Sequence, residues 1–144
     1  MITVKRLLQA KGDEIWSTTP ETSVFDALIL MAEKNIGALM VLESGKLAGI
    51  FSERDYARKV ILKGKTSKEV RVGEIMTEKV ITVAPNHSID ECMKLMTDNH
   101  IRHLPVIDDQ RLVGVIAIGD VLKAIIAEQQ STINQLEDYI KGKQ

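Results

Sequence analysis

Hydrophobic residues recur along the chain at two spacings, and the two spacings alternate in the same order twice. After Ser23 and again after Ser88, apolar residues lie three or four positions apart, which predicts two amphipathic helices. Each serine begins a Ser-x-x-acid pattern typical of a helix N-terminus, and the helices are expected to end near Asn35 and Asn99. Polar turns between short apolar runs predict two hairpins, with strands over residues 38–42, 47–51, 104–107 and 112–116.

Each half of the chain is expected to follow the order β-α-β-β-α. A short strand precedes each first helix, and a second helix follows each hairpin. The strands are expected over residues 15–18 and 80–83, and the second helices over about residues 53–63 and 119–128. Short lead-in helices are expected over residues 4–10 and 72–76, and an amphipathic tail helix over residues 129–143. The tail helix packs either on its own body or on a partner subunit.

The two halves are copies of one another. An ungapped offset of 65 residues aligns 11 identical residues between positions 15–61 and 80–126, including Gly49 with Gly114 and Asp55 with Asp120. An internal repeat of this length predicts paired supersecondary units. We therefore expect an α+β fold in which two pseudo-symmetric units pack as one module. Residues 1–65 form the first unit with its lead-in helix, residues 66–128 the linker and second unit, and residues 129–144 the tail.

Composition narrows the classes of function. The 144 residues carry a net charge of −1 and only 3% aromatic residues, so neither a basic footprint nor stacking rings indicate a nucleic-acid binder. No apolar run is long enough for a signal peptide or a membrane span. Cys92 is the only cysteine, which excludes an intramolecular disulfide and fits a reducing compartment. We expect a cytoplasmic protein without membrane or nucleic-acid partners.

Several short motifs resemble those of a known family. The pieces are Ile75-Met76-Thr77 followed by residues 80–83, the stretch 100–106, and the stretches 112–115 and 118–120. Residues 38–41, 47–50 and 52–55 match in the first half. Two copies in this order, from about Val4 to Glu128, make the chain similar to a tandem pair of CBS domains.

The resemblance implies a function. Such pairs bind adenosine-containing ligands, namely AMP, ADP, ATP, S-adenosylmethionine or NAD, in two clefts between the units. They pass the signal to an attached domain or a partner protein, and two modules commonly form a flat four-unit disk. This chain leaves almost no length for an effector domain, so we expect a stand-alone regulatory module, a homodimer that acts on another protein. The alternative is a structural or interaction protein of the same fold with one or both clefts non-binding.

The resemblance also implies a ribose-binding Asp in the pattern [ST]-x-x-D. Ser52 and Asp55 match it in the first unit, and Asp120 matches the acid in the second. A carboxylate can accept hydrogen bonds from both hydroxyls of a ribose. The other interpretation of Ser-x-x-Asp is a helix capping box, and one residue pair can serve both roles. Ala117 replaces the hydroxyl in the second unit, so the two clefts are expected to differ.

Phosphate would require local cations. Arg102 matches a position where the family often places a phosphate-binding Arg, and His103 follows it. Arg54 and Arg58, near the start of a predicted helix, could supply further charge. The alternative for each is a solvated surface side chain. His100 and His103 lack a nearby carboxylate pattern, so a metal site is not expected.

Adenine would require an apolar slot with backbone edges for hydrogen bonds. For most of the candidates, core packing is the favoured interpretation over a ligand contact. Pro105 is the exception, since a proline at a strand start has no ladder N–H to lose. The candidates are Thr18, Met40, Val41, Ile81, Thr82, Val83, Pro105 and Val106. No catalytic motif is present, so we expect neither an enzyme nor a catalytic cofactor.

Overall fold

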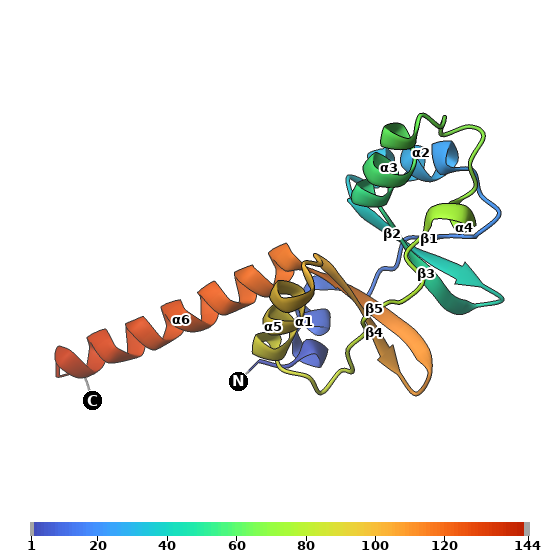
Figure 1. The fold of residues 1–144 in the computed structure, drawn as a ribbon. Helices are drawn as coiled ribbons and strands as arrows, with labels where there is room; N and C mark the ends of the chain where they lie inside the picture. The colour runs from blue at the N-terminus through green and yellow to red at the C-terminus, as the bar shows by residue number, and fades with distance from the viewer. Residues whose placement is uncertain (1, 143–144) are drawn as a thin grey trace.

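The computed structural model describes residues 2–142, in which two units each pack helices on a small sheet (Figure 1). The predicted α+β fold of two units is confirmed. The first unit holds β1 (Ser17–Thr18), α2 (Val24–Lys34), β2 (Ala38–Glu43), β3 (Lys46–Ser52) and α3 (Glu53–Lys59). The second holds α5 (Ile89–Asn99), β4 (His103–Asp108), β5 (Arg111–Ala117) and α6 (Ile118–Ile140). The other elements are α1 (Val4–Lys11), the 3₁₀ turn η1 (Ile61–Lys63) and α4 (Val72–Ile75).

The first helix of each unit begins and ends where the sequence predicts. The Ser23 hydroxyl accepts a hydrogen bond from the Asp26 N–H at 3.1 Å, and Ser88 forms a complete capping box with Glu91. Both helices end at a residue with a left-handed backbone, Asn35 or His100, each with φ of 54°. Such a residue lets the chain leave the helix sharply and enter the next strand.

The two sheets differ because of one proline. In the first unit, β1 runs parallel to β2, and the Met40 N–H donates to the Trp16 carbonyl at 3.2 Å. Pro105 is the equivalent of Met40 and has no N–H, so it cannot bind the Ile81 carbonyl in this way. The strand predicted over residues 80–83 is accordingly reduced to a single bridge at Val83. The predicted strand-start position of Pro105 is wrong, because Pro105 lies inside β4.

Two helices also depart from the prediction. The helix expected over residues 53–63 ends at Lys59, and the chain turns at the fully buried Val60 into η1. The tail is continuous with the preceding helix, because α6 runs without a break for 23 residues. Residue 143 of the predicted tail helix lies outside the described residues. Within residues 2–142, no helix is both long enough and apolar enough to cross a membrane.

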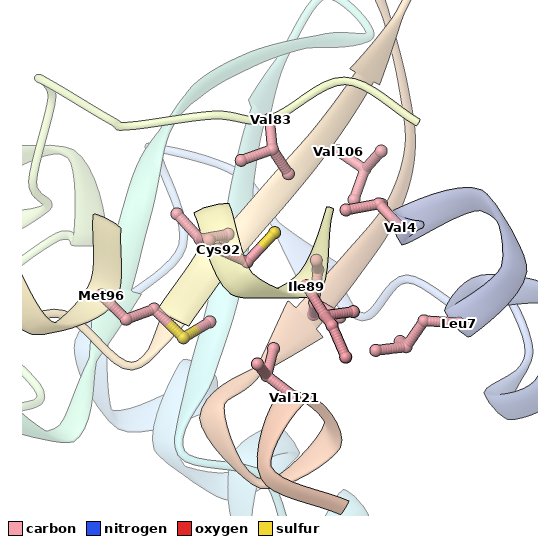
Figure 2. Packing of buried hydrophobic residues seen from close by; sticks show 10 residues of the cluster. Val4, Leu7, Val83, Ile89, Cys92, Met96, Val106 and Val121 are labelled. Carbon is pink, nitrogen blue, oxygen red and sulfur yellow. The ribbon is translucent and has the colours of Figure 1, made fainter. Parts of the chain in front are cut away.

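Each lead-in helix packs on the other unit, not on the unit that follows it in the sequence. Val4 and Leu7 of α1 lie in the core of the second unit beside Ile89 (Figure 2), and α4 lies in the core of the first. The helix α1 precedes the first unit in the sequence, but its packing makes it part of the second unit. The segments that follow α1 and α4 must cross between the units. These crossings bring residues from both halves to the same clefts.

Candidate functional site

A cavity of about 470 Å³ lies between the two units. This volume is within the usual range for a small-molecule site. Its walls come from the end of β3 and the start of α3 in the first unit, the crossing segment after α4, and the start of β4. The lining residues are Gly37, Ile50, Ser52, Glu53, Arg54, Asp55, Thr77, Lys79, Val80, Ile81, Ile101, Arg102 and His103.

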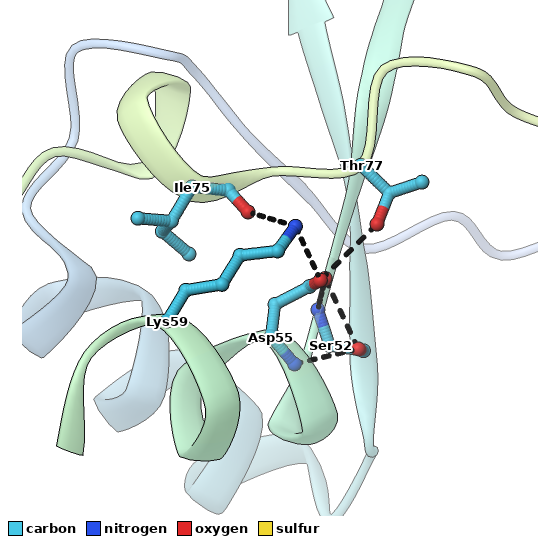
Figure 3. A network of polar contacts seen from close by, with 5 residues as sticks. All are labelled: Ser52, Asp55, Lys59, Ile75 and Thr77. Carbon is cyan, nitrogen blue, oxygen red and sulfur yellow. Dashed lines mark hydrogen bonds and ion pairs between the residues drawn. The ribbon is translucent and has the colours of Figure 1, made fainter. Parts of the chain in front are cut away.

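Asp55 stands at the centre of a hydrogen-bond network on one wall of the cavity (Figure 3). The residue as a whole is only 7% exposed. Oδ2 accepts from the Ser52 N–H at 3.0 Å and from the Ser52 hydroxyl at 3.1 Å. Oδ1 accepts from the Thr77 hydroxyl at 3.1 Å and forms an ion pair with Lys59 Nζ at 3.1 Å. The capping box that was the alternative interpretation of Ser52 and Asp55 is present in α3.

Two members of this network were not anticipated from the sequence. Lys59 Nζ also donates to the Ile75 carbonyl at 2.9 Å, so it ties α3 to the end of α4. The repeat offers no signal for Lys59, because its equivalent is Ala124. Thr77 lies in the Ile75-Met76-Thr77 motif that carried the family resemblance. Its position on Asp55 is visible only once α4 is known to pack on the first unit.

The cationic side chains gather at the same cavity. Arg54, Arg102 and Lys79 line it, and Lys79 was not anticipated. Arg54 Nη1 donates to the His100 carbonyl at 2.8 Å, a bond that joins the first unit to the second. Arg58 is exposed on α3 and is not among the residues that line the cavity. Of the proposed phosphate ligands, Arg54, Arg102 and His103 therefore line the cavity, and Arg58 does not.

The imidazole of His103 also lines the cavity. Burial lowers the pKa of His103 below its ordinary value, and the charges of Lys11 and Arg102 lower it further, while Asp120 opposes them. At neutral pH the ring is therefore uncharged and can donate or accept one hydrogen bond. Glu53 also lines the cavity and contributes negative charge.

The repeat equivalent of Asp55, Asp120, has different partners. Asp120 Oδ2 accepts from the Ala117 N–H at 2.9 Å and forms an ion pair of 2.7 Å with Lys11 at the end of α1. Lys11 Nζ also donates to the Val115 carbonyl at 2.8 Å. At the repeat offset, Lys11 corresponds to Met76, the residue before Thr77. A lysine ammonium thus stands at Asp120, whereas a neutral threonine hydroxyl approaches Asp55.

Most adenine candidates lie in the core. Ile81 lines the cavity, and its carbonyl receives no N–H from Pro105. Thr82 lines a separate cavity of about 390 Å³, and Thr18 is half-buried and pairs with Val41 in the sheet. The remaining candidates are buried inside the units: Met40, Val41, Val83, Pro105 and Val106. Among residues 2–142, no group of three or more potential metal ligands occurs.

The family is decided by comparison with known proteins. The model of the CBS domain matches the chain twice, over residues 12–62 and 72–127. The chain belongs to the CBS-domain family. It is 47% identical to the CBS domain-containing protein CBSX3, mitochondrial, of Arabidopsis thaliana over 138 residues. That match covers 92% of this chain but 66% of the Arabidopsis protein, so the chain spans slightly less than two thirds of that relative.

Solved structures of CBS-domain proteins share the arrangement. A protein from Burkholderia ambifaria described as a signal-transduction protein with CBS domains is 53% identical, with a TM-score of 0.85. The match covers 88% of this chain and 96% of that one. Another CBS-domain pair, 28% identical with a TM-score of 0.77, was solved with 5-methylthioadenosine and S-adenosyl-L-methionine. That match covers 89% of this chain and 98% of the other.

Proposed function

We propose that this CBS pair binds an adenosine-containing ligand (AMP, ADP, ATP, NAD or S-adenosylmethionine) in the cavity between its units and regulates a partner protein. One observation carries the proposal. Candidates chosen from separate parts of the sequence for different parts of a nucleotide line the same cavity: Ser52, Asp55, Arg54, Ile81, Arg102 and His103. A solved CBS pair with two adenosine compounds supports this ligand class.

Asp55 is proposed to hold the ribose. Its oxygens already accept four contacts, so a ribose diol would take the places of the Ser52 and Thr77 hydroxyls. Both hydroxyls can rotate away and donate elsewhere, whereas Lys59 keeps its ion pair with the carboxylate. The adenine edge is proposed to meet Ile81, whose carbonyl lacks its strand partner. Phosphate or another anionic group would then lie toward Arg102, Lys79 and Arg54.

Signalling is proposed to follow from the two-sided construction of the cavity. Asp55 and Arg54 belong to the first unit, whereas Arg102 and His103 belong to the second. A ligand that contacts both units binds best in one relative arrangement, so it shifts the population toward that arrangement. The same shift would alter the geometry of a homodimer, proposed here as a four-unit disk, and thereby its contact with the regulated protein.

The second cleft is proposed to bind more weakly. Asp120 is its proposed ribose ligand, but a diol there would have to displace a charged Lys11 rather than a neutral hydroxyl. Ala117 also removes one hydroxyl from that cleft. The alternative is a structural or interaction protein of the same fold in which one or both clefts do not bind.

The cytoplasm is the proposed location. Its support is Cys92, a single free and buried thiol that suits a reducing compartment. The Arabidopsis relative is named mitochondrial, which makes the mitochondrial interior the competing location. Fractionation of cells that express the tagged full chain distinguishes the two.

Ligand binding is tested by unfolding and by one charge removal. At about 100 times its dissociation constant, a ligand of the native state stabilises the protein by about 2.7 kcal/mol. We expect at least one of the five adenosine compounds to produce this shift. Arg102→Ala removes a charge-assisted contact worth about 1.5–3 kcal/mol, so we expect roughly tenfold or greater weakening of an anionic ligand in calorimetric titration.

Arg111→Ala is the matched control, because Arg111 is exposed on the same unit and does not line the cavity. It should leave affinity unchanged. If none of the five compounds moves the unfolding midpoint, the structural alternative replaces the binding function. If a compound binds but Arg102→Ala and Arg111→Ala behave alike, the ligand lies elsewhere.

A further inference from the structure

The second half of α6 leaves the body of the protein (Figure 1). The helix has 23 residues and is therefore about 35 Å long. Val121, in its first turn, is buried in the core of the second unit, but every residue from Gln129 to Ile140 is exposed. A helix that projects from its body gains stability from packing of its apolar face, so an exposed apolar face indicates a missing partner.

The exposed leucine and isoleucine residues of α6 follow a heptad repeat. The steps along Leu122, Ile126, Gln129, Ile133, Leu136 and Ile140 alternate between four and three residues. Five of these six positions are aliphatic, and these residues are 45%, 62%, 47%, 57% and 81% exposed in chain order. We call the line of these six residues the tail seam. A spacing of 3.5 residues is the signature of a coiled coil.

The residue types at the seam favour one kind of partner. Ile126, Ile133 and Ile140 occupy the a positions, and Leu122 and Leu136 occupy d positions. Among parallel coiled coils, β-branched residues at a with leucine at d favour two strands over three or four. We propose that the tail seam is covered by the tail seam of a second copy of this chain, as a parallel two-stranded coiled coil.

The positions that flank the seam are compatible with this pairing. In a parallel pair, each g residue lies near the following e residue of the partner helix. These neighbours would be Ile125 with Gln130 and Thr132 with Glu137, so no like charges meet. Gln129 is the one polar residue in the seam, and it faces its own copy only when the two helices are in register. Such a polar layer selects the in-register arrangement at some cost in stability.

The pairing also orients the bodies. The two-fold axis of a parallel coiled coil runs along the coil, so both helices leave their bodies from the same end. The second units of the two chains would then lie beside one another, and the cavities would be related by that axis. This orientation is independent of which ligand the cavities bind.

Cysteine cross-linking in the full chain tests the pairing without any nucleotide. The native Cys92 is fully buried and leaves the background low. Gln129→Cys and Ile140→Cys place thiols in the seam, whereas Ser131→Cys places one on the opposite face of the same helix. We expect mild oxidation to link the first two variants into dimers several-fold faster than the third, even at low micromolar protein.

The Ile140→Cys variant distinguishes a parallel from an antiparallel pair of helices. In an antiparallel pair, residue 140 would lie near residue 122 of the partner and could not meet its own copy. Linking of Gln129→Cys without Ile140→Cys overturns the parallel arrangement. Equal rates for all three variants, or no linking in any, overturn the coiled coil itself.

A second measurement guards against a cysteine variant that disturbs the helix. The full-length double variant Ile133→Asp with Leu136→Asp should lose part of the helical circular-dichroism signal, because an unpaired tail helix is marginal in water. Asn134→Asp adds a charge outside the seam and should keep the signal. If the double variant retains its helical signal and its mass in solution, the seam is not an interface. Nucleotide affinity plays no part in either readout.

Discussion

At the scale of single residues, we expect His103 to make ligand binding in the cavity depend on pH. Burial lowers the pKa of its imidazole, so the ring is neutral at pH 7. A phosphate bound beside it would raise that pKa again, and binding would take up a proton. We expect calorimetric affinity for AMP to increase as the pH falls from about 7.5 to about 6, the range of histidine titration.

The phosphate of AMP titrates in the same range, so the comparison is with His103→Gln rather than with a flat line. The variant should lose part of the pH dependence, and adenosine, which lacks phosphate, should show little in either protein. Superimposable pH profiles for AMP in the two proteins would exclude a contact with His103. Without ligand, stability should decline below about pH 6.5, because the unfolded chain binds the proton more readily than the folded chain.

The sequence predicts the residues of the cavity better than their contacts. Ser52 and Asp55 are visible as a pattern, and the structure joins them in a capping box. Thr77 and Lys59 complete the network through long-range packing, which local spacing does not encode. Other candidates were predicted for the adenine slot but lie in the core, such as Val41 and Val106. An apolar residue that alternates along a strand looks the same in a core as in a ligand slot.

At the scale of elements, β3 and the segment after α4 approach so closely that only glycine fits between them. A Cβ on Gly49 would lie 2.6 Å from the Thr77 carbonyl oxygen. Ile50 and Thr77 exchange two backbone hydrogen bonds, of 3.0 and 2.8 Å, which hold that oxygen in place. We expect Gly49→Ala to cost about 1–3 kcal/mol in urea unfolding and to weaken ligand binding.

Gly114→Ala is the matched control, since Gly114 is the repeat equivalent of Gly49. Its Cβ would meet only the end of the Leu8 side chain, at 2.8 and 2.9 Å, which can change rotamer. We expect a smaller loss of stability and an unchanged affinity. Equal losses of stability in the two variants would show that the backbone at Thr77 moves aside as easily as the Leu8 side chain does.

Element order is predictable here, but element partnership is not. The repeat locates the first helix of each unit because capping residues and apolar spacing agree locally. It does not reveal that α1 packs on the second unit and α4 on the first, since both short helices present similar apolar faces. Pro105 is a signal from which the loss of the strand before α5 can be predicted, because the sequence itself shows that a proline has no N–H.

At the scale of the whole molecule, the repeat yields two carboxylate sites, at Asp55 and Asp120, that are not equivalent. The first offers a buried carboxylate contacted by the rotatable hydroxyls of Ser52 and Thr77. The second offers Asp120, held by Lys11 from the end of α1. Because α1 packs on the second unit, that lysine is fixed by the exchange of the lead-in helices. Pseudo-symmetry in the fold therefore coexists with asymmetry in the chemistry.

Lys11→Met tests whether this ion pair keeps the second cleft from binding. Methionine is the residue at the equivalent position, Met76, so the substitution restores the repeat and releases Asp120. We expect the weaker second site to tighten, so that the calorimetric stoichiometry at ligand concentrations that fill only the first site of the native chain rises from one to two, with the affinity of the first site retained. Lys5→Met, an exposed change on the same helix, should leave one site. If Lys11→Met instead weakens the existing binding, then Lys11 contacts the ligand, and the second cleft is the one in use.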